Sequence, residues 1–285
     1  MISLPRLFLS TRAMLGVNHS SGTAPVGRLS DAAQIERVFA RAAEYGIPAI
    51  LTIGEASLMR PMKATHRRHR TQICPILPNM SSYVREASNY GLVGAGIRRL
   101  RRLGVPNLVR LGCHNFTKVA KVLQRDFNTM MSILFDVEMA EFRQMSPPVV
   151  FLDGQITDLC LAFGNNELLV RFAETIRGRY NAQPGLATHN LGALIPKLQH
   201  WNIPIQLVMA PFNRQGFAMK PDRSTCESLL RDKKFIFIAD RISVGAKPCA
   251  DTYYYLREHA ICSAVLDSTE ETDMELATNI FQHQR

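Results

Sequence analysis

The chain has 285 residues, of which 46% are hydrophobic and 20% are charged. It can bury a sizeable core in one large domain or two small ones, and its composition excludes a disordered chain or a coiled coil. The excess of 34 Lys and Arg over 24 Asp and Glu gives a formal charge of +10, which points to an anionic partner without identifying it.

The positive charge is concentrated in one part of the sequence. Between Arg60 and Arg125 there are 14 Lys or Arg residues and one acid, Glu86, so this segment carries a charge of +13. The other residues together carry −3. The basicity therefore belongs to one region, and the rest of the chain is slightly acidic.

The six cysteines are scattered and form no CxxC pair, which is typical of reduced thiols and predicts a cytoplasmic protein. No apolar run approaches the roughly 20 residues that a membrane helix needs, so we expect no membrane contact. A short targeting leader is an alternative, because Arg6 and Arg12 precede the first acid, Asp31.

Short apolar runs alternate with amphipathic segments from the start of the chain. Residues 14–18 (MLGVN) predict a first strand, and a helix capped by Ser30 and ended by Gly46 follows it. Two further strands are predicted at 49–53 and 72–77.

From about 81 to 146 the pattern becomes helical. Apolar side chains between 92 and 103 share one face of a predicted helix, with arginines on its other sides, and 127–142 also has helical spacing. We interpret this region as a basic helical insertion after the third strand.

Regular alternation resumes after Pro148. The predicted strands are 149–153, 185–189, 205–210, 235–239 and 261–266, and the predicted helices are 165–179, 191–200, 222–231, 249–258 and one from about 269, capped by Ser268. About eight strands, each followed by a helix, predict an α/β fold, a (β/α)₈ TIM barrel formed by residues 1–285 as one domain. A doubly wound open sheet is the alternative, but the turn after the first predicted strand (NHSSG) lacks the Gly-rich nucleotide pattern.

The segment from about 148 to 281 resembles the second half of aldo-keto reductase-like barrels. The similar pieces are PGLATHN, QLVMAPFN and FIFIADRISVG, followed by a terminal strand that enters a Ser-initiated helix. The resemblance implies the barrel fold and, as an alternative function, an NADPH-dependent oxidoreductase.

The catalytic residues of those reductases are not carried over with the resemblance. Their Lys after the third strand meets Pro78 and Asn79 here, and their His after the fourth strand meets Asp153 and Gln155. Their Asp and Tyr after the second strand meet Glu55 and no nearby tyrosine.

Polar residues follow most of the predicted strands, and TIM-barrel enzymes act at the carboxyl ends of their strands. We predict His189, Glu55 and Asp153 as catalytic residues, and we predict seven substrate-binding residues: Asn18, His19, Asn79, Asn190, Asn213, Asp240 and Arg241. For each one, a turn or a helix cap is the simpler interpretation.

An imidazole that follows an apolar strand can move protons near neutral pH, so His189 is the predicted acid or base. Glu55 and Asp153 are its predicted carboxylate partners, and Asn190 and Asn213 are predicted to donate to a developing oxyanion. Arg241 offers a bidentate fork to an anion.

The sequence requires no cofactor. A divalent metal at His19, Glu55, Asp153 and His189 is one alternative, although no HxH or HExxH motif supports it, and NADPH is another.

These residues predict an isomerase- or lyase-type enzyme acting on a small anionic metabolite. The alternatives are the oxidoreductase and a non-catalytic protein whose basic helices, within 92–125, dock an acidic protein or a second copy. Nucleic acid is disfavoured because this segment lacks interleaved aromatic residues.

Overall fold

Eight short, apolar and almost fully buried runs form the strands of the barrel. The computed structural model describes residues 4–16, 29, 31–80, 127–245, 247–259 and 261–282. The strands are β1 Leu7–Ser10, β2 Ala49–Ile53, β3 Gln72–Leu77, β4 Val149–Leu152, β5 Gln183–Ala187, β6 Leu207–Pro211, β7 Ile236–Asp240 and β8 Ser263–Leu266. Continuous apolar runs of this kind are expected where both faces of a parallel sheet are covered.

The strands form a closed, all-parallel barrel in sequence order. β1 closes it by pairing with both β2 and β8. Inside, the rings of Phe8 and Phe151 meet edge to face with centroids 6.5 Å apart. A Cβ on Gly185 would lie 2.5 Å from the Phe151 ring, so only glycine fits there. The barrel is thus a packed core, and its function is expected at the rim.

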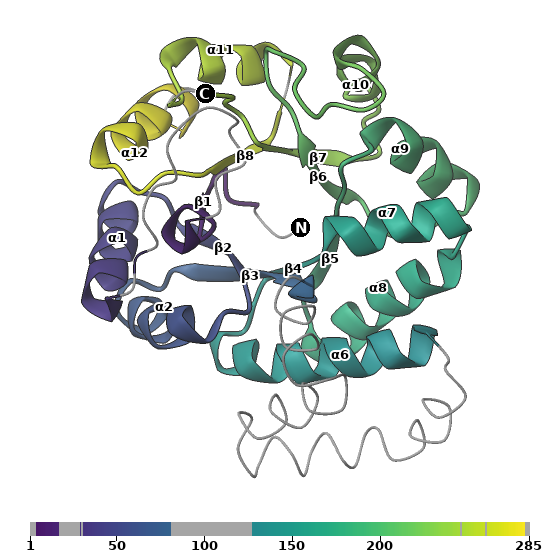
Figure 1. Ribbon diagram of the computed structural model, residues 1–285, viewed down its shortest axis with the longest axis horizontal. Helices are drawn as coiled ribbons and strands as arrows, with labels where there is room; N and C mark the ends of the chain where they lie inside the picture. The colour runs from purple at the N-terminus through teal and green to yellow at the C-terminus, as the bar shows by residue number, and fades with distance from the viewer. Residues whose placement is uncertain are drawn as a thin grey trace.

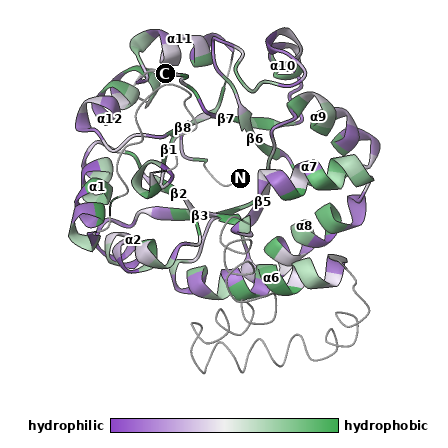
Figure 2. Cartoon of the chain, in the orientation of Figure 1, coloured by the Kyte–Doolittle hydropathy of each residue, from purple (hydrophilic) through white to green (hydrophobic). Residues whose placement is uncertain are grey.

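Helices surround the barrel, with apolar sides inward and polar sides outward (Figures 1 and 2). The α-helices among the described residues are α1 Ala32–Glu44, α2 Ala56–His69, α6 Phe127–Phe142, α7 Gly154–Phe163, α8 Asn166–Tyr180, α9 Leu191–His200, α10 Arg223–Leu229, α11 Ala250–Glu258 and α12 Glu271–Ala277. None of these is both long and apolar enough to cross a membrane. The predicted TIM barrel is confirmed.

The insertion after the third strand is confirmed where the structure describes it. α6 occupies 127–142 as the periodicity predicts, and a one-turn 3-10 helix, Arg143–Met145, connects it to β4. Residues 81–126, which hold the basic helices predicted within 92–125, lie outside the described residues.

The position of the first strand is a correction. β1 is Leu7–Ser10, not 14–18, and Met14 lies in a one-turn 3-10 helix, Ala13–Leu15. The LFLS run is buried at every position and pairs with strands on both sides. Arg12, rather than Asn18 or His19, therefore follows the first strand at the rim.

Two helix starts also differ from the prediction. Asp31 caps α1 by accepting a hydrogen bond from the Ala33 amide at 3.0 Å. α12 begins at Glu271, and Ser268 accepts a hydrogen bond from the Glu270 amide and donates to Asp273 at 2.6 Å. In addition, α7 and α8 both lie between β4 and β5, where we predicted one helix.

Candidate active site at the carboxyl ends of the strands

The carboxyl ends of the eight parallel strands meet at one rim of the barrel, as the topology requires. Most of the predicted site residues follow these ends directly. They are Glu55 after β2, Asn79 after β3, Asp153 after β4, His189 and Asn190 after β5, Asn213 after β6, and Asp240 with Arg241 at the end of β7. Asn18 and His19 lie outside the described residues.

His189 is held by a carboxylate that the sequence analysis missed. Asp158, in the first half of α7, places Oδ2 3.1 Å from His189 Nδ1 and accepts the His189 backbone amide at 3.1 Å. Its other oxygen accepts the Thr188 hydroxyl. A carboxylate on Nδ1 favours the tautomer with hydrogen on Nδ1, which leaves the Nε2 lone pair free to accept a proton.

Arg241 meets the other ring nitrogen of His189. Its Nη2 lies 3.1 Å from His189 Nε2, so the two side chains connect the ends of β5 and β7 across the end of β6. The Arg241 backbone has φ 48°, a left-handed conformation that non-glycine residues seldom adopt. Burial lowers the pKa of Arg241, partly offset by the charge of Asp240.

The guanidinium of Arg241 is also incompletely paired. Its Nε is buried and has no hydrogen-bond partner in the part of the chain that the structure describes. Buried N–H groups nearly always have an acceptor, and an exception at a strand end is a candidate ligand contact. Arg241 therefore has an open donor beside the lone pair of His189.

Asp153 lies next to His189 and caps α7. Its carboxylate accepts the Gln155 amide at 2.9 Å. Burial raises the pKa of Asp153, although the Gln155 amide and the charge of His189 oppose the rise. A Cβ on Gly154 would lie 3.0 Å from His189 Cε1, so the imidazole rests against the start of α7. The rim thus combines an oriented imidazole with a carboxyl group that holds its proton more tightly than usual.

Arg12 forms a second cluster at the same rim. Its Nη1 donates to Asp240 at 3.0 Å, its Nη2 donates to both Asp240 and Asp267, and its Nε donates to Asp267 at 3.1 Å and to Ser10 Oγ at 3.1 Å. Burial alone would raise the pKa of Asp240, but Arg12 outweighs it and holds that pKa well below its usual range. This cluster joins β1, β7 and β8.

Asn213 and Asn79 were predicted to bind substrate, but their side-chain amides form hydrogen bonds with backbone groups. Asn213 is fully buried, and its Nδ2 donates to the carbonyls of Phe217 at 2.9 Å and Arg241 at 3.1 Å, while its Oδ1 accepts the Phe217 amide. Asn79 donates from Nδ2 to the Gly54 carbonyl at 3.0 Å. Asn213 therefore fixes the loop that carries Arg241, and it has no donor left for an oxyanion.

Asn190 and Glu55 occupy helix starts. Asn190 Oδ1 accepts the Ala193 amide at 3.2 Å and caps α9. Its Nδ2 makes no hydrogen bond with any residue that the structure describes. Glu55 precedes α2, is partly exposed, and makes no side-chain cap bond. The structure places Glu55 at the rim, two residues after β2.

Four charged residues in the described part of the rim were not predicted as site residues: Arg12, Glu138, Asp158 and Asp267. Glu138 reaches from α6 and accepts the Asn79 backbone amide at 3.0 Å. Asp158 is five residues beyond Asp153, and a helix assigned from 154 would have placed it in the second turn near the rim. Arg12 could be placed at the rim only with the first strand assigned to Leu7–Ser10.

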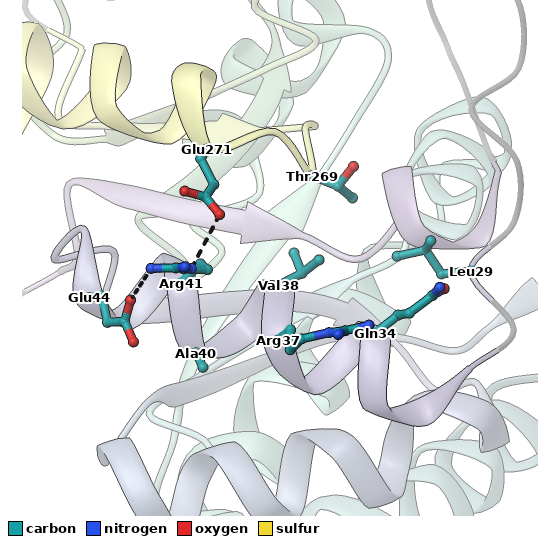
Figure 3. A pocket seen from close by; sticks show the side chains of 9 residues that line it. All are labelled: Leu29, Gln34, Arg37, Val38, Ala40, Arg41, Glu44, Thr269 and Glu271. Carbon is teal, nitrogen blue, oxygen red and sulfur yellow. Dashed lines mark hydrogen bonds and ion pairs between the residues drawn. The ribbon is translucent and has the colours of Figure 1, made fainter.

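No group of three or more metal-ligating side chains occurs in the described part of the chain. A surface hollow lies on the outer wall between α1 and α12, where Arg41 bonds Glu44 and Glu271 (Figure 3). Neither His189 nor Arg241 lines it. The candidate site is therefore the rim cluster.

No protein-family model matches the sequence. No curated protein matches it either.

Solved structures do match the fold. An aldo/keto reductase from Brucella melitensis superposes with a TM-score of 0.55 at 10% identity, over 99% of this chain and 91% of that one. The apo form of Gox0644 gives 0.54 at 8% identity, over 99% of this chain and 85% of that one. An uncharacterized B. cereus protein has a TM-score of 0.47 at 11% identity, over 96% of this chain and 65% of that one. The first two show that this chain shares the barrel fold of those proteins over almost its whole length.

Proposed function

We propose that the protein is an enzyme that removes a proton from a small anionic substrate and returns one to it, as isomerases and lyases do. The observation that carries this proposal is the position of His189 between Asp158 on Nδ1 and Arg241 on Nε2, each at 3.1 Å. An imidazole oriented by a carboxylate on one nitrogen is a general base on the other.

The proposed first step uses the lone pair of His189 Nε2. In the absence of a ligand, Arg241 Nη2 donates to that lone pair. An anionic group on the substrate would attract the guanidinium, and the freed Nε2 would then take a proton from the carbon next to a carbonyl. Asp158 keeps the Nδ1 hydrogen bond and stabilises the imidazolium that forms.

The second step requires a proton donor and a partner for the developing oxyanion. Asp153, whose pKa burial raises, is suited to donate a proton to a substrate oxygen or leaving group. Asn190 Nδ2 is the proposed hydrogen-bond donor to that oxygen. In an isomerase, the protonated His189 then gives its proton to another carbon while Asp153 takes back the proton that it gave to the oxygen. In a lyase, the proton of Asp153 leaves with the departing group, and the imidazolium of His189 and the carboxylate of Asp153 are reset by proton exchange with solvent.

A nicotinamide-dependent reductase is the alternative from the fold family. The described strand ends place Asn79 after β3 and Asp153 after β4, where that chemistry would use Lys and His, and residues 54–58 contain no tyrosine. These residues do not fit reductase catalysis on a nicotinamide, so the proposal contains no hydride-transfer step. The docking role of residues 92–125 stays a prediction.

Proton exchange with solvent tests the proposal without knowledge of the full reaction. The protein is incubated in D₂O with a mixture of 2-oxo acids, 2-hydroxy acids and sugar phosphates, and deuterium uptake is read by mass spectrometry. We expect uptake into at least one compound, and its loss in His189→Gln. His200→Gln, on the exposed far end of α9, is the matched control and should retain exchange.

Exchange in folded His189→Gln at the rate of the unmodified protein, rather than at a low residual rate, would contradict the proposal. So would the absence of uptake into every compound with the unmodified protein.

A further inference from the structure

Arg241, which follows β7, differs from Arg12, which follows β1. Arg12 donates to two carboxylates, Asp240 and Asp267. Among the residues that the structure describes, the Arg241 side chain donates only to the imidazole of His189, and its buried Nε has no acceptor. Of the two, Arg241 is the guanidinium whose charge no hydrogen-bonded carboxylate balances. Its unpaired Nε is therefore a candidate ligand contact.

The charge around Arg241 limits what that ligand can be. Asp153 and Asp158 lie on the His189 side, and Asp240 and Asp267 lie on the Arg12 side. A ligand with one negative charge can pair with the Arg241 guanidinium, which donates to no carboxylate among the described residues. A second negative charge, as on a phosphate monoester, would be repelled by these carboxylates.

The geometry of the Arg241 guanidinium also favours a carboxylate ligand. Nε and one terminal nitrogen of a guanidinium form a planar fork that matches the two oxygens of a carboxylate. His189 Nε2 lies 3.1 Å from Arg241 Nη2, so a carbon within a few bonds of that carboxylate can reach the base. A carbonyl beside the carboxylate would make such a C–H acidic.

We propose that the site binds a small 2-oxo monocarboxylic acid, with its carboxylate on Arg241 and its C3 carbon facing His189. This inference rests on the proposed function for the role of His189, whereas the binding step depends on Arg241. The base removes a C3 proton, the electron pair moves to the carbonyl oxygen as an enolate, and the imidazolium returns the proton.

Ligand binding tests the inference, measured by isothermal titration calorimetry. The probes are pyruvate and 2-oxobutanoate, with pyruvamide as the neutral analogue and methyl phosphate as the dianion. We expect saturable binding of at least one 2-oxo acid, and at least tenfold weaker binding of pyruvamide and methyl phosphate. Binding of methyl phosphate as tight as that of both acids, or no binding of either acid, would overturn the inference.

Variants connect that binding to Arg241. Arg241→Lys keeps the charge but removes the fork, and should weaken 2-oxo acid binding at least tenfold. Arg214→Lys, the same change at an exposed position after β6, is the matched control and should bind as the unmodified protein does. Equal affinities in all three proteins would overturn the inference.

The proposed function and the ligand class can fail separately. Binding through Arg241 without deuterium uptake would leave the carboxylate site standing and remove the proposed function. Uptake into a sugar phosphate that depends on His189, with no 2-oxo acid bound, would leave the function standing and remove the ligand class.

Discussion

Arg12 and Arg241 follow strands of the same barrel rim and both lie beside Asp240, yet their surroundings differ. Arg12 is enclosed by Asp240, Asp267 and Ser10. Arg241 has a left-handed backbone, a buried Nε with no acceptor among the described residues, and a hydrogen bond to the imidazole of His189. A charge that the fold fully pairs stabilises structure, whereas one held incompletely paired is suited to a ligand.

The largest effect on stability should come from breaking the paired cluster. Arg12→Met leaves the buried Asp240 and the half-buried Asp267 without their cation. This costs about 3–5 kcal/mol of unfolding free energy. Arg241→Met removes an unsatisfied donor together with one hydrogen bond, so stability should change by less than about 1 kcal/mol. Urea unfolding measures the free energy of unfolding of both variants.

Equal losses in the two variants would contradict the distinction between the two arginines. Asp31→Asn, which keeps the cap of α1, controls for the loss of an unrelated charge.

A smaller effect, on activity alone, is expected from Asp158→Asn. The amide can still bond Nδ1, but it no longer favours the Nδ1–H tautomer or stabilises the imidazolium. We expect deuterium exchange to slow about 100-fold, equivalent to about 2.7 kcal/mol, with an unchanged urea midpoint. Exchange within twofold of the unmodified protein would show that Asp158 only supports the loop.

The pH dependence of stability should follow the paired cluster. The pKa of folded Asp240 lies below its ordinary value of about 3.9, because Arg12 outweighs the effect of burial. As pH falls, the unfolded chain therefore takes up this proton first, so the contribution of Asp240 is complete above about pH 5 and is lost towards pH 2. The stability gap between the unmodified protein and Arg12→Met should narrow over that range.

Urea midpoints measured at intervals from pH 6 downward check this behaviour. Asp153 should act in the opposite direction, because a raised pKa makes the folded state hold the proton more tightly as pH rises. If the stability difference between the unmodified protein and Arg12→Met widened on acidification, the assigned role of Asp240 would be wrong.

The smallest effect is expected from Gly154→Ala. The new Cβ would lie 3.0 Å from His189 Cε1, which forces the ring to shift by a few tenths of an ångström. We expect about tenfold slower exchange with little loss of stability. Gly178→Ala, which has open space around its Cβ, is the control and should exchange normally.

Much of the fold could be predicted because the strand signal is local. Runs such as VVFL and FIFIA are apolar, short and bounded by helices, and they place Asp153, His189 and Arg241 at the rim. The prediction of the first strand was wrong because LFLS is only four residues long and the nearby apolar run MLGVN has a similar strand pattern.

The site was less predictable because its contacts join distant parts of the chain. Arg12 and Asp240 are separated by 228 positions, and no periodicity records their pairing. Asp158 was missed because residues 154–163 were not assigned to a helix. The roles of Asn213 and Asn79 depend on which backbone carbonyls surround them, which only the folded chain determines.

The most direct test of the central claim is a double-mutant cycle on the deuterium-exchange rate with Asp158→Asn and His189→Gln. If Asp158 acts through His189, the double variant should exchange as slowly as His189→Gln alone. Losses that add in full would show that the two residues act independently, and the proposed acid–base unit would be wrong.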